Sequence, residues 1–197
     1  MREIRALKKQ IREEYLEKRS SIDPARKREM DERLCELFTS LTTFRYSDDI
    51  LLYAPKGSEV NVMLIAERAL RAGKRVAFPL CDPEQLSMSF HFVESTSQLV
   101  PGSYGLLEPP PELPVYDKAS GRSAVCVVPG IVFDKNGYRI GYGKGYYDRY
   151  FADFKGSRVG LVYSELLKDR LPRGKFDRAM DIVITEKGVK IITAPSR

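Results

Sequence analysis

The residues whose types and spacing point most clearly to a chemical function lie between Arg139 and Tyr150, in the run RIGYGKGYYDRY. Glycines alternate there with bulkier residues, Lys144 stands among them, and a helix-compatible run follows. Glycine lets backbone N–H groups turn toward a ligand without obstruction by a Cβ atom. Where such a loop opens a helix, free N–H groups and the positive helix end converge into a site for anions. We therefore interpret the run as a cradle for a triphosphate.

The two best-known phosphate-binding motifs do not match this run. The P-loop pattern GxxxxGK[ST] requires glycine at position 138 and Ser or Thr at position 145, where the sequence has Tyr138 and Gly145. The dinucleotide pattern GxGxxG requires glycine at position 146 or 148, where it has Tyr146 and Asp148. These mismatches argue against a P-loop NTPase and a dinucleotide-binding enzyme. A plain glycine-rich turn remains the alternative to a phosphate site.

Length and composition are those of a soluble globular protein. The chain has 197 residues, 43% hydrophobic and 30% charged, and we expect a single domain over residues 1–197. The net charge of +6 suits an anionic ligand, but also nucleic acid or an ordinary solvated surface. No apolar run approaches the roughly 18 residues of a membrane span, and the N-terminus has no apolar signal segment. We expect a cytoplasmic protein without a membrane partner.

The cysteines and the single histidine do not suggest a metal centre. Cys35, Cys81 and Cys126 are odd in number and far apart, which predicts reduced thiols. No zinc-ligand spacing joins them to His91. His91 lies in an alternating segment and is predicted to be a strand residue.

Hydrophobic periodicity places the glycine-rich run within an alternation of strands and helices. A first helix carries apolar residues at helical spacing among many basic ones, namely Ile4, Leu7, Ile11 and Tyr15. A second helix follows the cap and proline at Asp23-Pro24. A further helix over 64–73 and a hairpin turn at Asn136-Gly137 are predicted, with strands at 49–53, 75–79, 88–93, 124–129, 158–163, 181–185 and 189–192. Residues 95–121 are predicted to form a long ordered surface connection.

This order of elements predicts an α/β layered fold with a mainly parallel central sheet flanked by helices, preceded by a long basic N-terminal helix. Ligands in such folds bind at the carboxyl ends of the strands. The loops 54–59 and 139–148 are both predicted to lie there. We expect them to form one site.

One stretch of the chain resembles the 5-formyltetrahydrofolate cyclo-ligase family: Val128-Pro129-Gly130-Ile131-Val132-Phe133-Asp134, followed by Arg139 to Asp148. The resemblance extends over nearly the whole length, from Lys8-Lys9-Gln10-Ile11-Arg12 through Glu59 to Asp181-Ile-Val-Ile-Thr185-Glu186. The combination PG-[IL]-x-FD with GxGxGYYD is specific, whereas the basic helix alone is not. Members of this family use Mg-ATP to close 5-formyltetrahydrofolate into 5,10-methenyltetrahydrofolate, releasing ADP and phosphate.

The resemblance implies roles for particular residues. It implies that ATP is contacted by Lys8, Lys9, Gln10, Ile11, Arg12, Arg139, Ile140, Gly141, Tyr142, Gly143, Lys144, Gly145, Tyr146 and Tyr147. It implies folate contacts from Ala54, Glu59, Tyr142, Gly143, Lys144, Gly145 and Tyr146. Asp148 and Asp181 match magnesium ligands, and we assign catalytic roles to Lys144 and Tyr146.

These residue types suit the implied chemistry. Phosphoryl transfer depends on positioning and charge neutralisation more than on a protein nucleophile. Hard carboxylate oxygens suit Mg²⁺. Two positions depart from the family pattern: Ala54 stands where a larger apolar residue can occur, and Phe176-Asp177 replaces the His-Asp of many members.

Each of these residues also has a purely structural explanation. Lys8 and Arg12 could form only the wet face of a helix, and Glu59 could cap the helix that follows it. Asp148 could pair with Arg149 or Lys144, and Asp181 could simply begin a strand.

Two other functions stay open beside the cyclo-ligase. One is an RNA-binding module with stacking aromatics at Tyr146, Tyr147, Tyr150 and Phe151. The other is an ATP-dependent enzyme for a different small carboxylic or formylated molecule. From the resemblance we expect folate substrates, and the basic surface suits the polyglutamate tail that some of them carry. We also expect no nucleic-acid partner and a monomer or weak dimer.

Overall fold

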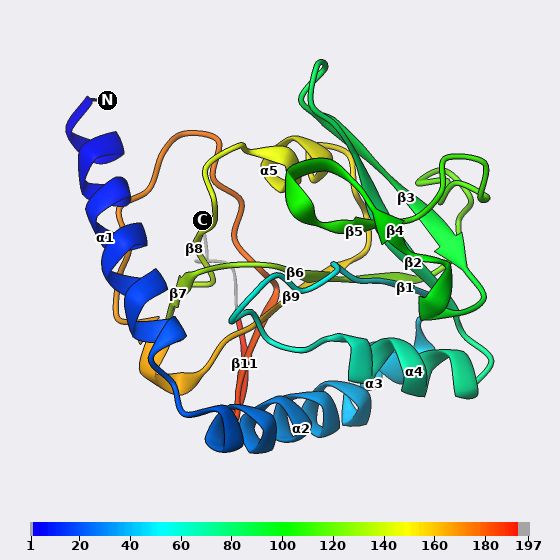
Figure 1. The fold of residues 1–197 in the computed structure, drawn as a ribbon, viewed down its shortest axis with the longest axis horizontal. Coiled ribbons are helices and arrows are strands. Elements are labelled where there is room, and N and C mark those ends of the chain that lie inside the picture. Colours follow the sequence, from blue (N-terminus) through cyan, green and yellow to red (C-terminus); the bar gives the residue numbers. More distant parts are fainter. Residues whose placement is uncertain (1, 193–197) are drawn as a thin grey trace.

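A seven-stranded sheet forms the centre of the computed structural model, which describes residues 2–192 (Figure 1). Its strands lie in the order β12, β11, β9, β6, β1, β2, β3. Their bounds are β1 Asp49–Leu51, β2 Arg75–Asp82, β3 Ser87–Val93, β6 Ala124–Val128, β9 Ser157–Leu161, β11 Ile182–Thr185 and β12 Gly188–Ile191. The inner strands are parallel, and only the edge strands β3 and β12 run antiparallel to their neighbours. The prediction of a mainly parallel sheet is confirmed.

The direction in which strands are added reverses between β1 and β6. From β1 the chain continues to β2 and β3 on one side, and from β6 to β9 and β11 on the other. β6 is buried at every position, as expected for a valine-rich strand that is covered on both faces. Ligand sites of parallel sheets form at such a reversal, beyond the carboxyl ends of the strands. The loops after β1 and β6 therefore mark the expected site.

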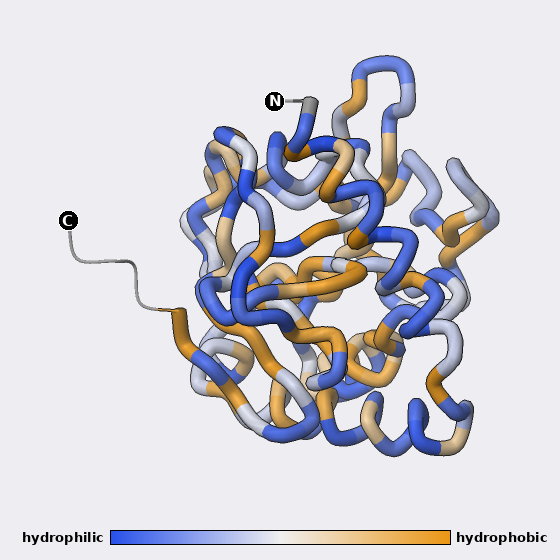
Figure 2. The backbone as a smooth tube through the Cα atoms, turned by 90° about the vertical axis from the view of Figure 1, so that its left-hand side faces the viewer, coloured by the Kyte–Doolittle hydropathy of each residue, from blue (hydrophilic) through white to orange (hydrophobic). Residues whose placement is uncertain are grey.

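Helices lie on both sides of the sheet. In Figure 1, α2 (Pro24–Ser40), α3 (Thr42–Tyr46) and α4 (Met63–Arg71) lie below the sheet, and α5 (Tyr146–Tyr150) lies above it. α2 begins as predicted, because Asp23 accepts hydrogen bonds from the first N–H groups of the helix and Pro24 occupies its first position. Figure 2 shows the hydrophobic segments gathered in the interior and hydrophilic segments around them.

The N-terminal helix α1 (Arg2–Ser20) packs mainly through its second half. Ile11 and Tyr15 are buried, whereas Ile4 and Leu7 of the predicted apolar stripe are 36% and 46% exposed. The long basic N-terminal helix is thus present, but its apolar stripe is only half buried.

The predicted hairpin is formed by β7 (Val132–Asp134) and β8 (Arg139–Ile140), which join β10 (Leu167–Lys168) in a second small sheet after η3 (Ser164–Leu166). Its turn requires Gly137, since φ is 84° and a Cβ atom there would lie 2.8 Å from the Met180 carbonyl oxygen. β8 leads directly into the glycine-rich loop and so fixes one end of it.

The connection over 95–121 is ordered, as predicted. It contains η1 (Thr96–Gln98), β4 (Val100–Pro101), η2 (Ser103–Gly105) and β5 (Leu107–Glu108). Glu108 is buried and anchors the turn between β4 and β5. Its carboxylate accepts hydrogen bonds from the N–H groups of Cys81 at 3.0 Å and Ser103 at 2.8 Å.

The remaining predictions from single residues also hold. The three cysteines are free. His91 lies in β3, and its ring hydrogen-bonds to the Ser89 hydroxyl and the Leu113 carbonyl, each at 2.9 Å. Within residues 2–192, no helix combines the length and the apolar character that crossing a bilayer requires.

Candidate active site

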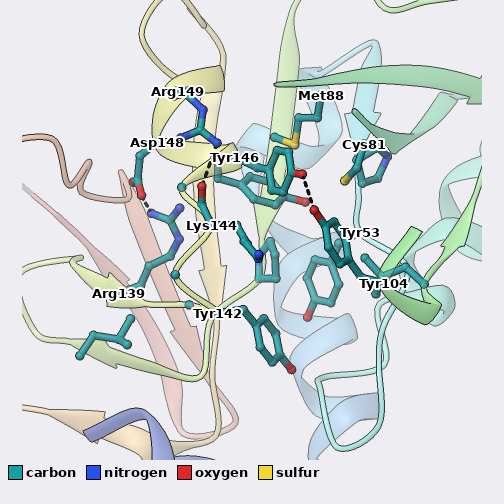
Figure 3. A pocket seen from close by; sticks show the side chains of 18 of the residues that line it. Tyr53, Cys81, Met88, Tyr104, Arg139, Tyr142, Lys144, Tyr146, Asp148 and Arg149 are labelled. Carbon is teal, nitrogen blue, oxygen red and sulfur yellow. Dashed lines mark hydrogen bonds and ion pairs between the residues drawn. The ribbon is translucent and has the colours of Figure 1, made fainter. Parts of the chain in front are cut away.

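A cleft of about 1180 Å³ opens where the loops after β1 and β8 meet (Figure 3). It is lined by both of these loops, by α5, by the β4–β5 turn, by part of α1 and by the segment 176–178. A pocket for one drug-sized ligand commonly measures about 300–1,000 Å³. The cleft therefore has room for more than one small molecule, and the expected meeting of loops 54–59 and 139–148 is confirmed.

The glycine-rich loop has unused N–H groups beside this cleft. Gly143 and Gly145 have φ values of 90° and 72°, which glycine adopts readily and other residues do not. Among the described residues, none accepts a hydrogen bond from the backbone N–H groups of residues 142–145. The loop opens α5 as predicted, but this helix has just five residues, so its dipole adds little to the donors of the loop itself.

Two cations reach the loop from α1. Arg12 donates a hydrogen bond from Nε to the Gly141 carbonyl oxygen at 2.8 Å. Lys8 lies one turn earlier and forms an ion pair with Asp177. Both side chains line the cleft. α1 thus brings two positive charges to the same place as the loop N–H groups.

Lys144 is a positive charge without a partner. Its Nζ lies 5.5 Å from the centre of the Tyr104 ring, and within residues 2–192 it forms no ion pair. Arg139, by contrast, pairs with Asp148 at 3.2 Å, and this pair is visible beside Lys144 in Figure 3. Lys144 is therefore available to a polyanion.

Tyr146 and Tyr147 both border the cleft but have different neighbours. The Tyr146 hydroxyl lies 3.0 Å from the Tyr104 hydroxyl of the β4–β5 turn (Figure 3). Tyr147 packs edge-on against Phe90 of β3, with ring centres 6.4 Å apart. Its hydroxyl is buried and has no hydrogen-bond partner in the described part of the chain. Tyr146 thus ties α5 to the turn, and Tyr147 ties it to the sheet.

The loop after β1 contributes a buried carboxyl group. Glu59 accepts a hydrogen bond from the Lys56 N–H at 2.8 Å. Burial raises the pKa of Glu59, and this outweighs the lowering by the Lys56 N–H and by Arg19. Ala54 is also buried and lines the cleft.

Residues 4–186 match the model of the 5-formyltetrahydrofolate cyclo-ligase family. The chain belongs to this family. The family and the fold that the motif implied are therefore confirmed.

Individual relatives agree with this cyclo-ligase assignment. The 5-formyltetrahydrofolate cyclo-ligase of Escherichia coli is 26% identical over 88% of this chain and 97% of its own length. That of Mycolicibacterium smegmatis is 31% identical over 70% of this chain and 73% of its own. The structure of Aquifex aeolicus 5,10-methenyltetrahydrofolate synthetase matches with a TM-score of 0.84 at 32% identity, covering 97% of this chain and 95% of that one.

Not every residue that the resemblance assigns to ATP lies at the cleft of this cyclo-ligase. Lys9 is 74% exposed beside Glu13, Gln10 is exposed, and Ile11 belongs to the core. Successive side chains on a helix point in different directions, so only positions three or four apart share a face. Lys9, Gln10 and Ile11 of the predicted ATP contacts therefore do not line the cleft, whereas Lys8 and Arg12 do.

Asp181 also lies away from the cleft. Its carboxylate accepts hydrogen bonds from the Arg158 guanidinium at 3.0 and 2.6 Å, and from the Arg158 N–H at 2.7 Å. It precedes β11, at the amino end of a parallel strand, whereas the site lies at the carboxyl ends. The predicted pair of magnesium ligands is therefore not brought together, and only Asp148 lines the cleft. In residues 2–192, no three metal-ligating side chains cluster.

We expect Asp181→Ala to weaken the fold and to leave the Mg²⁺ concentration that gives half the maximal rate at the wild-type value. The Asp181 side chain is 42% exposed, and partly exposed ion pairs contribute about 1 kcal/mol or less. Urea unfolding would measure this loss, and a magnesium titration of the rate would measure the metal dependence. Asp148→Asn, titrated in parallel, should need more Mg²⁺ for half the maximal rate. If Asp181→Ala also needed more Mg²⁺, the predicted role of Asp181 as a magnesium ligand would be supported.

Sequence reasoning missed several residues that line or support the cleft: Arg19, Lys56, Tyr104, Asp177 and Arg178. One of them left a signal. Lys8, Arg12 and Arg19 fall on a single stripe of α1, because helical positions eleven apart nearly coincide in direction. Tyr104 and Asp177 lie in irregular turns, where no periodicity marks a functional face.

Proposed function

We propose that the chain is a single ATP- and folate-binding domain that cyclises 5-formyltetrahydrofolate to 5,10-methenyltetrahydrofolate, consuming Mg-ATP and releasing ADP and phosphate. One observation carries the proposal. An unpaired lysine and unused N–H groups lie in the same cleft as a buried glutamate. The first set suits a polyphosphate, and a buried carboxylate suits the hydrogen-bond donors of a heterocycle such as the pterin. Family membership supports the same reaction.

The residues present fit a nucleoside triphosphate at the glycine-rich loop. N–H groups of a glycine-rich loop bind phosphate oxygens well, and cationic side chains strengthen such bonds. Lys144 lies within this loop, and Arg12 contacts it. Lys8 lies one helical turn before Arg12 on α1. The Lys8–Asp177 pair would exchange one anionic partner for another when phosphates enter.

Asp148 fits a magnesium ion held together with these phosphates. Mg²⁺ is commonly bound through one or two carboxylates, substrate phosphates and water rather than by a complete protein cage. Asp148 lines the cleft and is 26% exposed. Arg139 holds its carboxylate from one side at 3.2 Å. The ion would neutralise phosphate charge during transfer.

The proposed chemistry joins the two ends of the cleft. The oxygen of the N5-formyl group attacks the γ-phosphorus of ATP, and ADP leaves. This step turns the formyl oxygen, a poor leaving group, into a phosphate ester. N10 then attacks the formyl carbon and loses its proton, and the C–O bond breaks as inorganic phosphate departs. Lys144 and the loop N–H groups stabilise charge on the transferred group. Tyr146, whose hydroxyl lies beside that of Tyr104, orients the substrate between the two ends of the cleft.

A direct assay tests the proposal. The purified protein is mixed with Mg-ATP and 5-formyltetrahydrofolate, and the absorbance of the methenyl product is followed over time. Product must form, and omission of either ATP or Mg²⁺ must abolish it. ATP hydrolysis only with another formylated or carboxylic acceptor would favour the alternative enzyme. Salt-sensitive binding of an RNA oligonucleotide without any turnover would favour the binding module.

The affinity for folate is expected to depend on the ionisation of Glu59. Its pKa is raised above the ordinary value of 4.5 by burial. Because the ionised form is the better acceptor, KM for 5-formyltetrahydrofolate should rise as pH falls through this raised pKa, and level off above it. Glu59→Gln should raise KM by about ten-fold, the scale for a hydrogen bond to a charged group, and remove the pH dependence. An unchanged pH profile in Glu59→Gln would exclude this role.

A further inference from the structure

Arg19 is a buried arginine at the end of α1 that the proposed chemistry does not use. It is 3% exposed. Its guanidinium donates from Nε to the Ser58 hydroxyl at 3.0 Å, and from its other nitrogens to the Gly130 carbonyl at 3.1 Å and the Tyr142 hydroxyl at 3.0 Å. These partners lie on the loop after β1, the loop after β6 and the glycine-rich loop. One side chain therefore connects three of the loops around the site.

The burial of this charge calls for a physical reason. Removing a cation from water costs several kcal/mol unless partners compensate it, and an apolar side chain of similar volume would often stabilise the fold as well. Within residues 2–192, Arg19 forms no ion pair with a carboxylate. Its three neutral partners accept hydrogen bonds from three of its five N–H groups but do not balance its charge. The nearby carboxyl group is that of Glu59, which is buried and follows Ser58 in the chain. Burial raises the pKa of Glu59, and Arg19 is one of the groups that lower it.

The Tyr142 ring shows what the hydrogen bonds of Arg19 achieve. Tyr142 borders the cleft and is half exposed there, while its hydroxyl is held by Arg19. Burial and, after it, the charge of the nearby Glu59 raise the pKa of this hydroxyl. A tyrosine on a glycine-rich loop would otherwise rotate freely, because the flanking glycines offer no side chains to pack against it.

We propose that Arg19 is a positioning residue for the substrate end of the cleft: its hydrogen bonds hold the Tyr142 ring and Ser58, the chain neighbour of Glu59, where this end meets the folate. This inference builds on the proposed function, because it specifies how the substrate end of that same site is arranged. Arg19 is not among the residues that line the cleft. It acts through Tyr142 and Glu59.

The electrostatics of Glu59 agree with this role. The charged or titratable groups that face it are Arg19, Lys56, Tyr142 and Tyr53. Burial raises the pKa of Glu59, while Arg19 and Lys56 lower it. Loss of Arg19 must therefore raise this pKa further, and the carboxyl group would become protonated at a higher pH.

Kinetics of Arg19→Met provide the first test. We expect KM for 5-formyltetrahydrofolate to rise about ten-fold, with kcat and KM for ATP unchanged, since only the substrate end loses its arrangement. The pH at which KM begins to rise should shift upward. Arg19→Lys keeps the charge and should restore the pH profile, but not the full affinity. Lys18→Met is the matched control, because Lys18 is exposed and donates to the Glu165 carbonyl outside the cleft.

A ligand-free measurement separates this inference from the proposed function. The carboxyl carbon signal of Glu59, assigned by its loss in Glu59→Gln, is titrated by NMR in the wild type, Arg19→Met and Lys18→Met. We expect the Glu59 pKa to rise above its wild-type value in Arg19→Met and to stay unchanged in Lys18→Met. If the wild type lacks cyclo-ligase activity but this shift appears, the proposed function fails and the Arg19–Glu59 coupling stands. A folded Arg19→Met with an unshifted Glu59 and an unchanged folate KM would overturn the inference.

Discussion

Lys144→Ala is expected to lower kcat by about 10²-fold or more, the scale for losing a group that stabilises charge in the transition state. Lys144 is a cation at the cleft whose Nζ forms neither an ion pair nor a hydrogen bond with the described residues, and it lies among N–H groups that are also unused. Its charge is thus free to follow the phosphoryl group during transfer. Turnover at saturating Mg-ATP and folate measures the effect.

The fold should not suffer from this change. Lys144 is exposed and forms no ion pair with any residue from 2 to 192, so the thermal midpoint of Lys144→Ala should equal that of the wild type. Lys144→Arg keeps the charge and should retain part of the activity. Wild-type turnover in folded Lys144→Ala would remove Lys144 from the catalytic machinery and leave the phosphates to the backbone N–H groups, Lys8 and Arg12.

Arg12→Ala should lower kcat/KM for ATP by about 10²-fold, because two contributions are lost together. One is the charge for the phosphates. The other is support of the loop: Arg12 holds the Gly141 carbonyl at 2.8 Å, and a Cβ atom at Gly143 would lie only 3.1 Å from its guanidinium. Initial rates at varied ATP concentration measure the loss.

Lys9→Ala is the matched control for Arg12→Ala. It removes a positive charge three residues away on α1, but from a side chain that points to solvent beside Glu13. We expect its kcat/KM for ATP to stay at the wild-type value at moderate salt, where charges at that distance are largely screened. Equal losses in the two variants would show that the overall charge of α1, rather than the contact of Arg12 with the loop, governs nucleotide binding.

The architecture was accessible from sequence because its signals are local. The valine-rich run of β6, the Asn136-Gly137 turn and the Asp23-Pro24 cap each specify one element, and an alternation of such elements favours a parallel sheet. The glycine-rich loop was equally visible, because three glycines have no reason to alternate within a strand or a helix.

The parts that sequence reasoning missed depend on contacts between distant segments. Asp181 has the type of a metal ligand, but its partner Arg158 lies on a neighbouring strand. Tyr104 reaches the site only because Glu108 anchors its turn to β2. Nothing local distinguishes such residues from other polar or aromatic residues of a surface turn. Pairing across the chain, rather than residue type, decides which side chains face the cleft.

The half-buried helix α1 links order at the N-terminus to the occupancy of the cleft. Lys8 lies in the weakly packed half of α1, and Arg12 lies where the well-packed half begins. A polyphosphate bound by both side chains would therefore connect α1 to the glycine-rich loop. Without such a ligand, the ion pair between Lys8 and Asp177 connects the first turns of α1 to the rest of the structure. Binding energy that phosphates gained from these cations would also stabilise the packing of the first turns of α1, so the proposed ligand binding and the order of these turns would be coupled.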